Sequence, residues 1–522
     1  MARQKSEDCT VPEGRRKPVP TRDVEQGGGG KAVPVDKQAR QLGLFFGTAE
    51  DREAFAERVD GGAEAGRPAP APTAKPKPKN KEKRVASTTM EEVSSRLREA
   101  FQKVASNKGA PGPDRQRIDE VRAHLDEILP KLQAALLAGT YRPGDIRRVW
   151  IPKAGGQRGL GIPNVVDRVV QEAVRAVLEP LYEPTFHEAS HGFRPGRSCH
   201  TAIARAREYV DEGYEWVVDL DLEKFFDKVN HQRLMARLAQ RVQDRRLLEL
   251  IGLMLKARVV MPDGVAVRTE EGVPQGGPLS PLLSNIVLDE LDRELAARRH
   301  RFVRYADDCN IYVRSERAGQ RVMASIALFI ERRLRLKVNA SKSAVARPSE
   351  RHFLGFRLER KPEDGTVEVV LSKRSTERIG ARIRELTPRT WGRSLRDCIA
   401  MLNVYLVGWL AFFGICTSGV EYALRVLDAH IRRRLRAIQL AHWKTKRTRA
   451  RRLIQLGVNP KTAWRNVYEQ RKSLWALSHS PAVNRGLCNA YFAERGLISL
   501  EQRWREAQRP LVAPVQLTLA LG

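Results

Sequence analysis

The spacing of apolar and polar positions divides the chain into a patternless beginning and a periodic remainder. Residues 1–87 contain a run of four glycines and a Pro- and Lys-rich stretch. Such segments cannot bury enough apolar surface to offset the entropy that a chain loses on folding. Regular periodicity begins near Thr88. The pattern therefore predicts a disordered, basic, Pro- and Gly-rich tail ahead of a folded remainder.

Helical and strand-like patterns mix in the first part of this remainder. Leucine and phenylalanine recur at helical spacing in residues 88–106, with Thr89 near the expected N-cap. Because helices and strands follow one another without regular βαβ repetition, the pattern predicts an α+β fold. Helices are expected at 88–106, 119–139, 167–186 and in the second half of 272–295, and strands at 147–153, 216–222, 302–305 and 309–313.

From about residue 373 onward the pattern is mainly helical. Residues 404–415 are rich in aromatic side chains, and we expect them to be buried. Residues 430–453 are intensely basic and include Trp443. Cations supply affinity for phosphate, and an indole ring stacks on unpaired bases, so this segment is a candidate RNA-binding surface.

Composition strengthens the case for a polyanionic partner. The 522 residues carry a formal net charge of +31. Nucleic acid is the favoured partner, because basic groups displace counterions from phosphates, and an anionic membrane is the rival. We find no apolar run long enough to span a bilayer and no apolar signal-peptide core. The six cysteines show no CxxC spacing, which argues against a zinc ribbon and against secreted disulfides.

Two adjacent carboxylates, Asp307 and Asp308, stand between apolar runs that predict a hairpin with both aspartates at its tip. Such neighbours repel each other and are costly to desolvate unless a cation neutralises them. Mg²⁺ prefers oxygen ligands and often shares them with phosphates. A third carboxylate is available at the end of the apolar run 216–222. Asp219 and Asp221 share a face there, so periodicity leaves both candidates open.

Three segments in order carry a family resemblance. Residues 305–309 (YADDC), preceded by 221–227 (DLEKFFD) and 272–281 (GVPQGGPLSP), resemble the palm motifs of reverse transcriptases. The resemblance to bacterial group II intron maturases extends over roughly residues 88–520. Further segments that share it begin at residues 107, 139, 159, 191, 338, 352 and 402.

The resemblance implies a right-hand polymerase with fingers, palm and thumb, followed by a mainly α-helical maturase region. No His-Asn-His nuclease pattern with paired cysteines follows, so we expect no endonuclease domain. The expected divisions are the tail (1–87), the fingers and palm of the reverse transcriptase (88–372), the thumb and RNA-binding maturase region (373–457) and a DNA-binding-like C-terminal tail (458–522).

The resemblance also selects Asp221 over Asp219 and implies two Mg²⁺ ions at the catalytic aspartates Asp221, Asp307 and Asp308. Phe226 lies at the family's sugar-gate position, where a ring clashes with a ribose 2′-hydroxyl and favours dNTPs. The expected metal ligands are Asp221, Leu222, Asp307 and Asp308. The expected dNTP-binding residues are Lys153, Arg158, Phe226, Gln275, Gly276 and Lys342. The expected RNA-binding residues are Arg432, Arg433, Arg434, Arg436, Trp443, Lys444, Lys446 and Arg447.

The function that follows from the resemblance is an RNA-directed DNA polymerase that also binds its group II intron RNA to promote splicing and mobility. The expected partners are that RNA, an RNA template, a DNA primer or target, dNTPs and a second copy of the chain, in the bacterial cytosol or nucleoid, with no membrane. The alternatives are a reverse transcriptase of phage defence or a CRISPR locus, and an RNA-binding splicing factor with an inactive polymerase.

Overall fold

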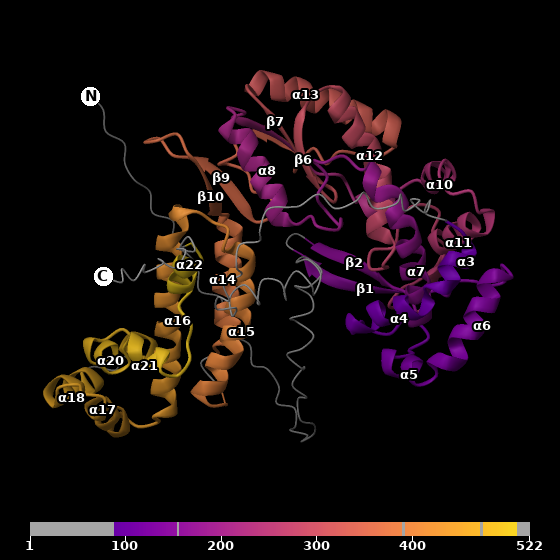
Figure 1. The fold of residues 1–522 in the computed structure, drawn as a ribbon. Coiled ribbons are helices and arrows are strands. Elements are labelled where there is room, and N and C mark those ends of the chain that lie inside the picture. The colour runs from indigo at the N-terminus through magenta and orange to yellow at the C-terminus, as the bar shows by residue number, and fades with distance from the viewer. Residues whose placement is uncertain (1–87, 154–155, 389–391, 470–472, 509–522) are drawn as a thin grey trace, which may run out of the picture. The chain divides into compact units, whose positions relative to one another are not determined.

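The computed structural model describes residues 88–153, 156–388, 392–469 and 473–508. The expected tail, residues 1–87, lies outside the described residues. Within them, helices and strands mix without regular alternation (Figure 1), and the α+β fold class is confirmed.

The first helices of the described chain pack against α7 in one hydrophobic core. Thr89 Oγ1 accepts a hydrogen bond from the Glu92 amide at 3.3 Å, as the predicted N-cap requires. Two predicted helices are each divided into two: the first at Arg96 and the second at His124, whose backbone leaves the helical region. These helices are α3 (Met90–Ser95), α4 (Leu97–Ser106), α5 (Ile118–Ala123), α6 (Leu125–Leu137) and α7 (Val165–Tyr182).

A small sheet has the strand order β2-β1-β4-β5. Its main part is an antiparallel hairpin in which β1 coincides with the strand predicted at 147–153. The strands are β1 (Ile146–Lys153), β2 (Gly156–Ile162), β4 (Val259–Val260) and β5 (Ala266–Val267). Three helices that precede β4 in the sequence extend the same core. They are α9 (Phe225–Lys228), α10 (His231–Ala239) and α11 (Arg245–Leu255).

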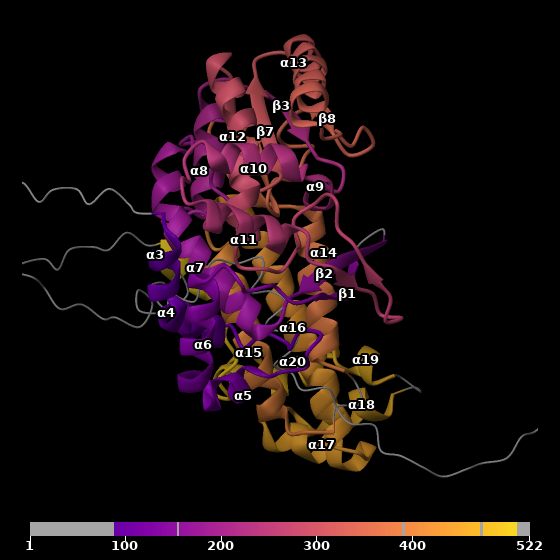
Figure 2. The ribbon, with the colours of Figure 1, turned by 90° about the vertical axis from the view of Figure 1, so that its right-hand side faces the viewer.

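A second sheet, entirely antiparallel between neighbours, has the order β6-β7-β3-β8. Its side chains alternate between two cores: Val218 and Ile311 join the first core, whereas Val217 and Tyr312 join the second. α12 and α13 contribute to the first core (Figure 2), and α8 contributes to the second. The elements are α8 (Cys199–Asp211), β3 (Trp216–Leu220), α12 (Ser280–Ala297), β6 (Arg301–Tyr305), β7 (Asp308–Val313), α13 (Glu316–Phe329) and β8 (Ala344–Ala346).

The second core is built mainly by the helices that the sequence pattern predicts from residue 373 onward. A hairpin that we did not predict, β9 (Phe356–Arg360) with β10 (Val367–Leu371), precedes them. The helices are α14 (Lys373–Leu386), α15 (Leu395–Phe413), α16 (Glu421–His442), α17 (Lys446–Gln455), α18 (Pro460–Tyr468), α19 (Leu474–Leu477), α20 (Pro481–Gly486), α21 (Asn489–Ala493) and α22 (Leu500–Gln508). Short helices of other types are η1 (Glu183–Thr185), η2 (Ile330–Leu334) and η3 (Ser418–Val420).

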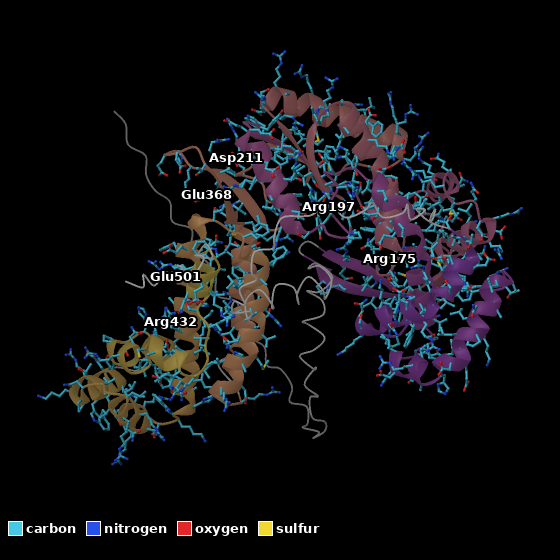
Figure 3. All side chains as sticks on the ribbon, in the orientation of Figure 1. Arg175, Arg197, Asp211, Glu368, Arg432 and Glu501 are labelled. Atoms are coloured by element: carbon cyan, nitrogen blue, oxygen red, sulfur yellow. The ribbon has the colours of Figure 1, made fainter. Side chains whose placement is uncertain are left out.

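The last helix folds back onto α16. Asp428 accepts hydrogen bonds from the Leu500 amide at 3.0 Å and the Ser499 hydroxyl at 2.6 Å, which caps the start of α22. Glu501 lies beside α16 (Figure 3), where Arg425 binds its carboxylate at 3.1 Å. The chain up to Gln508 is therefore anchored in the second core.

The expectation that no segment is long and apolar enough to span a bilayer is wrong for one helix. Among the described residues, α15 passes this test by length and composition, with 33% of its apolar window buried. Helices in the cores of water-soluble proteins pass the same test. In α15 the buried positions, such as Leu402, Leu406 and Trp409, pack in the second core.

Candidate active site

The turn between β6 and β7 carries the aspartate pair. Tyr305 pairs with Asp308, so Ala306 and Asp307 form the turn and Asp308 is the first residue of β7. The prediction that both aspartates occupy the tip is wrong by one residue. Ala306 has φ 56°, in the left-handed region that side chains disfavour, so its backbone needs support from its surroundings.

Arg304 supplies that support from beneath the turn. Its side chain is 0% exposed and donates to the Ala306 carbonyl at 2.8 Å and to Ser190 Oγ at 2.7 Å. The Asp292 carboxylate takes two further donors, at 2.7 and 2.5 Å, and Asn285 Oδ1 takes another at 3.0 Å. All five N–H donors of the guanidinium are thereby used. Burial disfavours the charge, but Asp292 outweighs burial and the pKa of Arg304 is raised.

Asn285 connects this hydrogen-bond network to the backbone at Gly192, which also lies against the turn. Its amide nitrogen donates to the Gly192 carbonyl at 2.8 Å. A Cβ on Gly192 would lie 2.2 Å from the Ala306 nitrogen, so only glycine fits beside the turn. We did not predict these supporting residues. The available signal was an arginine inside an apolar strand together with Asn285 and Asp292, which lie two turns apart on one face of the helix.

Asp219 and Asp221 differ in their position relative to β3 and in the cation that each contacts. Asp219 lies within β3, where the Arg351 guanidinium binds its carboxylate at 2.6 Å. Burial raises the pKa of the Asp219 carboxyl, although Arg351 opposes the shift. Asp221 lies just beyond the end of β3. Because Leu220 pairs with Cys309, continuing this register brings Asp221 opposite Asp308. Asp221 is thus the carboxylate that adjoins the aspartate pair.

Asp221 has a cation beside it already. Its Oδ2 atom is buried and accepts no hydrogen bond within the described structure, while Lys342 Nζ lies 3.4 Å away. Among the described residues, no three Asp, Glu, His or Cys side chains are arranged as a ready-made metal site. An under-satisfied, buried carboxylate oxygen fits a divalent cation, and Lys342 provides the positive charge next to it.

Two of the predicted nucleotide-binding segments meet beside this sheet. Arg158 Nε of β2 donates to Gln275 Oε1 at 2.7 Å, across 117 residues of sequence. The Gly161 amide donates to the Gln275 carbonyl at 2.7 Å. Gly276 has φ 127°, and a Cβ there would lie 2.5 Å from the Gly161 carbonyl oxygen. A glycine is therefore required where the loop approaches the hairpin.

The remaining predicted site residues, Phe226, Leu222 and Lys153, differ in the segments that they contact. Phe226 is 8% exposed, and its carbonyl accepts from the Val273 amide at 2.6 Å, which ties it to the same loop. Leu222 forms an isolated bridge with Val338, and its side chain is buried. Lys153 ends β1, where it pairs with Gly156, and its side chain lies outside the described residues.

The predicted RNA-binding residues divide into two groups. On α16, which also carries Arg432 (Figure 3), two arginines bridge helices: Arg434 donates to the Thr387 carbonyl at 2.5 Å and Arg436 to the Leu487 carbonyl at 2.8 Å. Arg433 lies over the Trp475 ring at 4.1 Å. Trp443 is half-buried against the second core. The exposed cations are instead Lys444, Lys446 and Arg447.

This division gives a prediction. We expect Arg436→Ala to destabilise the fold by about 1–3 kcal/mol, because the Leu487 carbonyl and Asn484 lose their donor, with RNA affinity unchanged in the folded protein. We expect the pair Lys444→Ala and Arg447→Ala to leave the thermal midpoint unchanged and to weaken RNA binding about tenfold at physiological salt. Thermal melts and RNA titrations check both. Equal loss of RNA affinity in the two variants would contradict the division.

Two family models match the chain. The model of the reverse transcriptase (RNA-dependent DNA polymerase) matches residues 151–358, and the model of the group II intron maturase-specific domain matches residues 376–456. The first extends from the end of β1 to the middle of β9, and the second covers most of α14 through α17.

Curated relatives agree with these models. Protein YkfC of Escherichia coli (strain K12) is 36% identical over 307 residues, 51% of this chain and 80% of that protein. The group II intron-encoded protein LtrA of Lactococcus lactis subsp. cremoris is 39% identical over 208 residues, 39% of this chain and 34% of LtrA. The nuclear intron maturase 4 of Arabidopsis thaliana mitochondria is 35% identical over 135 residues, 26% of this chain and 17% of that protein.

Among solved structures, a chain of a partial Cas6-RT-Cas1–Cas2 complex is 24% identical with a TM-score of 0.31, over 47% of this chain and 42% of that chain. This likeness carries no argument about function. The match to YkfC covers most of that protein, whereas the match to LtrA covers about a third of its length. Together with the two family models, these relatives confirm the predicted resemblance: the chain belongs to the family of group II intron reverse transcriptases with a maturase domain.

Proposed function

We propose that this protein is an RNA-directed DNA polymerase that extends a primer on an RNA template. The observation that carries the proposal is the strand register, which puts Asp221, just beyond β3, opposite Asp308 at the turn of the β6–β7 hairpin that also holds Asp307. Primer extension on an RNA template with Mg²⁺ and dNTPs tests it. We expect DNA product, and a folded protein that binds the template–primer without extending it would contradict the proposal.

The residues fit a divalent metal. Asp221, Asp307 and Asp308, with the backbone carbonyl of Leu222, would hold two Mg²⁺ ions, and the buried Oδ2 of Asp221 supports this assignment because it lacks a donor. Bound Mg²⁺ lowers the pKa of a primer 3′-hydroxyl and neutralises the charge that develops on the leaving pyrophosphate. The Lys342 side chain is 58% exposed, so it can leave Asp221 and bind the triphosphate of an incoming nucleotide instead.

The positions of the nucleotide-binding residues follow from the same geometry. Arg158 and Gln275, already hydrogen-bonded to each other, orient the incoming dNTP, with Arg158 offering its remaining donors to phosphate oxygens. Gly276 lets the loop backbone approach the nucleotide closely. In this arrangement the β1–β2 hairpin belongs to the fingers and the β6-β7-β3-β8 sheet is the palm. Residues 373–457 are the thumb and RNA-binding region, and residues 458–522 contact DNA.

The sugar gate gives a second prediction. We expect Phe226→Val to raise the kcat/KM for rNTPs relative to dNTPs by about 10- to 100-fold, because a smaller side chain leaves room for the 2′-hydroxyl. Phe225→Leu is the matched control: its ring is 2% exposed and packs 5.2 Å from Phe226. It should cost stability without changing the ratio. Single-nucleotide incorporation kinetics measure both, and an unchanged ratio in folded Phe226→Val would remove Phe226 from the gate.

We further propose that the protein binds its group II intron RNA and promotes splicing and mobility in the bacterial cytosol. The maturase-specific match at residues 376–456 and the net charge of +31 support this role. Splicing of a precursor RNA at limiting Mg²⁺, with and without the protein, tests it. We expect faster splicing with the protein present, and equal rates would contradict the maturase role while leaving the polymerase proposal intact.

A further inference from the structure

A basic groove lies at the end of the central hairpin away from the aspartate turn. It has a volume of about 460 Å³ and is bounded by the start of β6, the end of β7, the end of α12 and the outer side of α13. A strand rises about 3.3 Å per residue, so the length of the hairpin separates this groove from the turn by roughly 15 Å. The groove is therefore distinct from the candidate active site.

The lining of the groove is positive, and most of its charge has no ion-pair partner among the described residues. It contains Arg299, Arg301, Arg314 and Arg321 and no Asp or Glu. Arg301 lies 3.9 Å from Glu212, whereas the other three arginines have no ion-pair partner among the described residues. Arg314 lies over the ring of Tyr214 at 5.1 Å, which holds its guanidinium at the edge of the groove.

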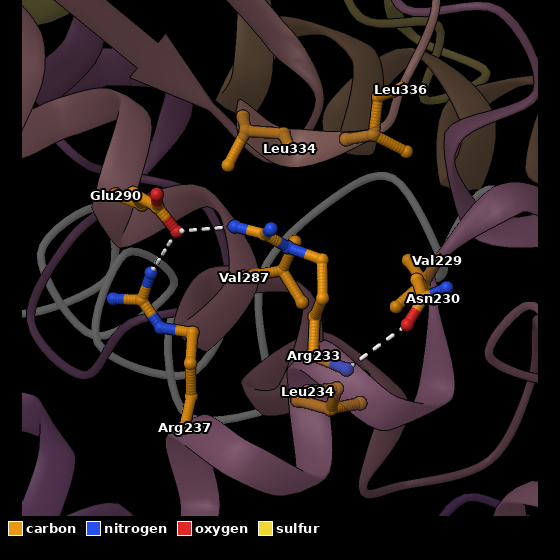
Figure 4. A pocket seen from close by; sticks show the side chains of 9 residues that line it. All are labelled: Val229, Asn230, Arg233, Leu234, Arg237, Val287, Glu290, Leu334 and Leu336. Atoms are coloured by element: carbon orange, nitrogen blue, oxygen red, sulfur yellow. Dashed lines mark hydrogen bonds and ion pairs between the residues drawn. The ribbon is translucent and has the colours of Figure 1, made fainter. Parts of the chain in front are cut away.

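A second hollow shows the contrast. Between α10, α12 and η2 is a small hollow of about 10 Å³, enough for a single water. Its arginines, Arg233 and Arg237, both bind Glu290, at 3.4 and 2.7 Å (Figure 4). Their charge is neutralised within the fold, and the space is too small for a ligand. The groove differs in both size and charge.

Arg299 occupies a backbone position that glycine would fill better. It follows the end of α12 with φ 57°, and its amide donates to the Ala296 carbonyl at 2.8 Å. The His300 amide donates to the Leu295 carbonyl at 2.9 Å. These two bonds define a Schellman C-cap, whose left-handed residue is usually glycine. The strained position therefore carries a guanidinium that lines the groove, where the glycine favoured by the backbone would leave no side chain.

We propose that this groove binds the sugar–phosphate backbone of a structured RNA, as a contact additional to the template–primer held at the aspartate turn. Guanidinium forks match phosphate oxygens, and unpaired arginines release counterions when a polyanion binds. The exposed part of Tyr214 and the aliphatic side of Val322 provide surface for ribose. The inference rests on the proposed function, in that it takes RNA to be the partner.

The first test separates binding from folding. Arg299→Gly relieves the left-handed strain, so we expect an equal or higher thermal midpoint. We also expect a several-fold weaker Kd for a folded transcript of a bacterial group II intron, because one phosphate contact is lost. Arg299→Lys, which keeps the charge, should recover part of the affinity. A more stable Arg299→Gly protein with unchanged RNA affinity would overturn the proposal.

The second test uses the salt dependence. We expect Arg314→Gln with Arg321→Gln to weaken binding of that transcript about 10- to 100-fold and to lower the slope of log Kd against log salt by about 1.5 to 2. The matched control, Arg122→Gln with Arg245→Gln, removes two exposed arginines that already pair with Asp119 and Glu249 and should change neither quantity. Equal effects of the two pairs would mean general charge loss and overturn the site.

Primer extension on a short RNA–DNA template–primer separates this inference from the proposed function. It should be unchanged in both groove variants, since the groove lies at the end of the hairpin away from the aspartate turn. Failure of extension in the wild-type protein would overturn the polymerase proposal while leaving the RNA titrations interpretable. A duplex DNA of the transcript's length is the competitor. If it binds as tightly as RNA and is equally sensitive to the groove variants, the assignment to RNA is wrong.

Discussion

Asp307→Ala is expected to abolish primer extension, with a loss of at least about 10³-fold in kcat, because it removes one of the carboxylates that we propose to hold the catalytic cation. The fold should survive. Asp307 is half-buried in a two-residue turn whose backbone is held by Arg304 from below and by the close approach of Gly192, and neither contact involves the Asp307 carboxylate. Extension assays at several Mg²⁺ concentrations, with wild type alongside, measure the effect.

Asp219→Asn is the matched control for this experiment. It removes a carboxylate from the same sheet, but one that Arg351 already binds and that pairs with Asn310, two residues further from the turn than Asp308. We expect it to keep most of the activity and to lose some stability, because Arg351 is left without its counter-charge. If Asp219→Asn inactivates the protein while Asp221→Asn does not, the choice between these two aspartates has to be reversed.

Arg304→Met is expected to have the largest effect on stability, about 3–5 kcal/mol, because it leaves the Asp292 charge buried without its partner. The surviving folded molecules should also be poor enzymes. Without the donor to the Ala306 carbonyl, the strained turn relaxes, and a shift of about 1 Å in the aspartates can cost 10²-fold in rate. Chemical denaturation and primer extension on the same samples measure the two effects.

A second variant distinguishes positioning from folding. Arg304→Met combined with Asp292→Leu removes the whole buried ion pair and should recover part of the lost stability. It should still require more Mg²⁺ for half-maximal activity, because the turn remains unsupported. Arg175→Met is the matched control: Arg175 (Figure 3) binds two carboxylates of α7, Glu172 and Glu179, far along the chain from the turn. It should lose stability with an unchanged Mg²⁺ requirement. Normal Mg²⁺ dependence in the double variant would contradict a positioning role for Arg304.

Local patterns in the sequence were enough to predict the elements that carry the site. The apolar runs on either side of Asp307 and Asp308 predicted the β6–β7 hairpin, although the tip lay one residue earlier. The helical pattern after residue 373 matched α14 to α22. These predictions hold because alternation and helical spacing depend only on neighbours in sequence. The divided helices at Arg96 and His124 were missed because no proline or glycine marks the break.

By itself, then, the sequence determined the α+β class, the aspartate pair, the excess of positive charge and the family to which the motifs belong. The family resemblance favoured Asp221 over Asp219, and tertiary structure supplied the physical difference between them, since the two share a periodicity but only Asp219 meets Arg351. It also brought Arg158 to Gln275, buried Arg304 with Asp292, and left three of the four groove arginines without an ion-pair partner among the described residues. Each of these outcomes depends on contacts between segments that are distant in sequence or on which charges find a partner in the packed fold, and neither is encoded in local spacing.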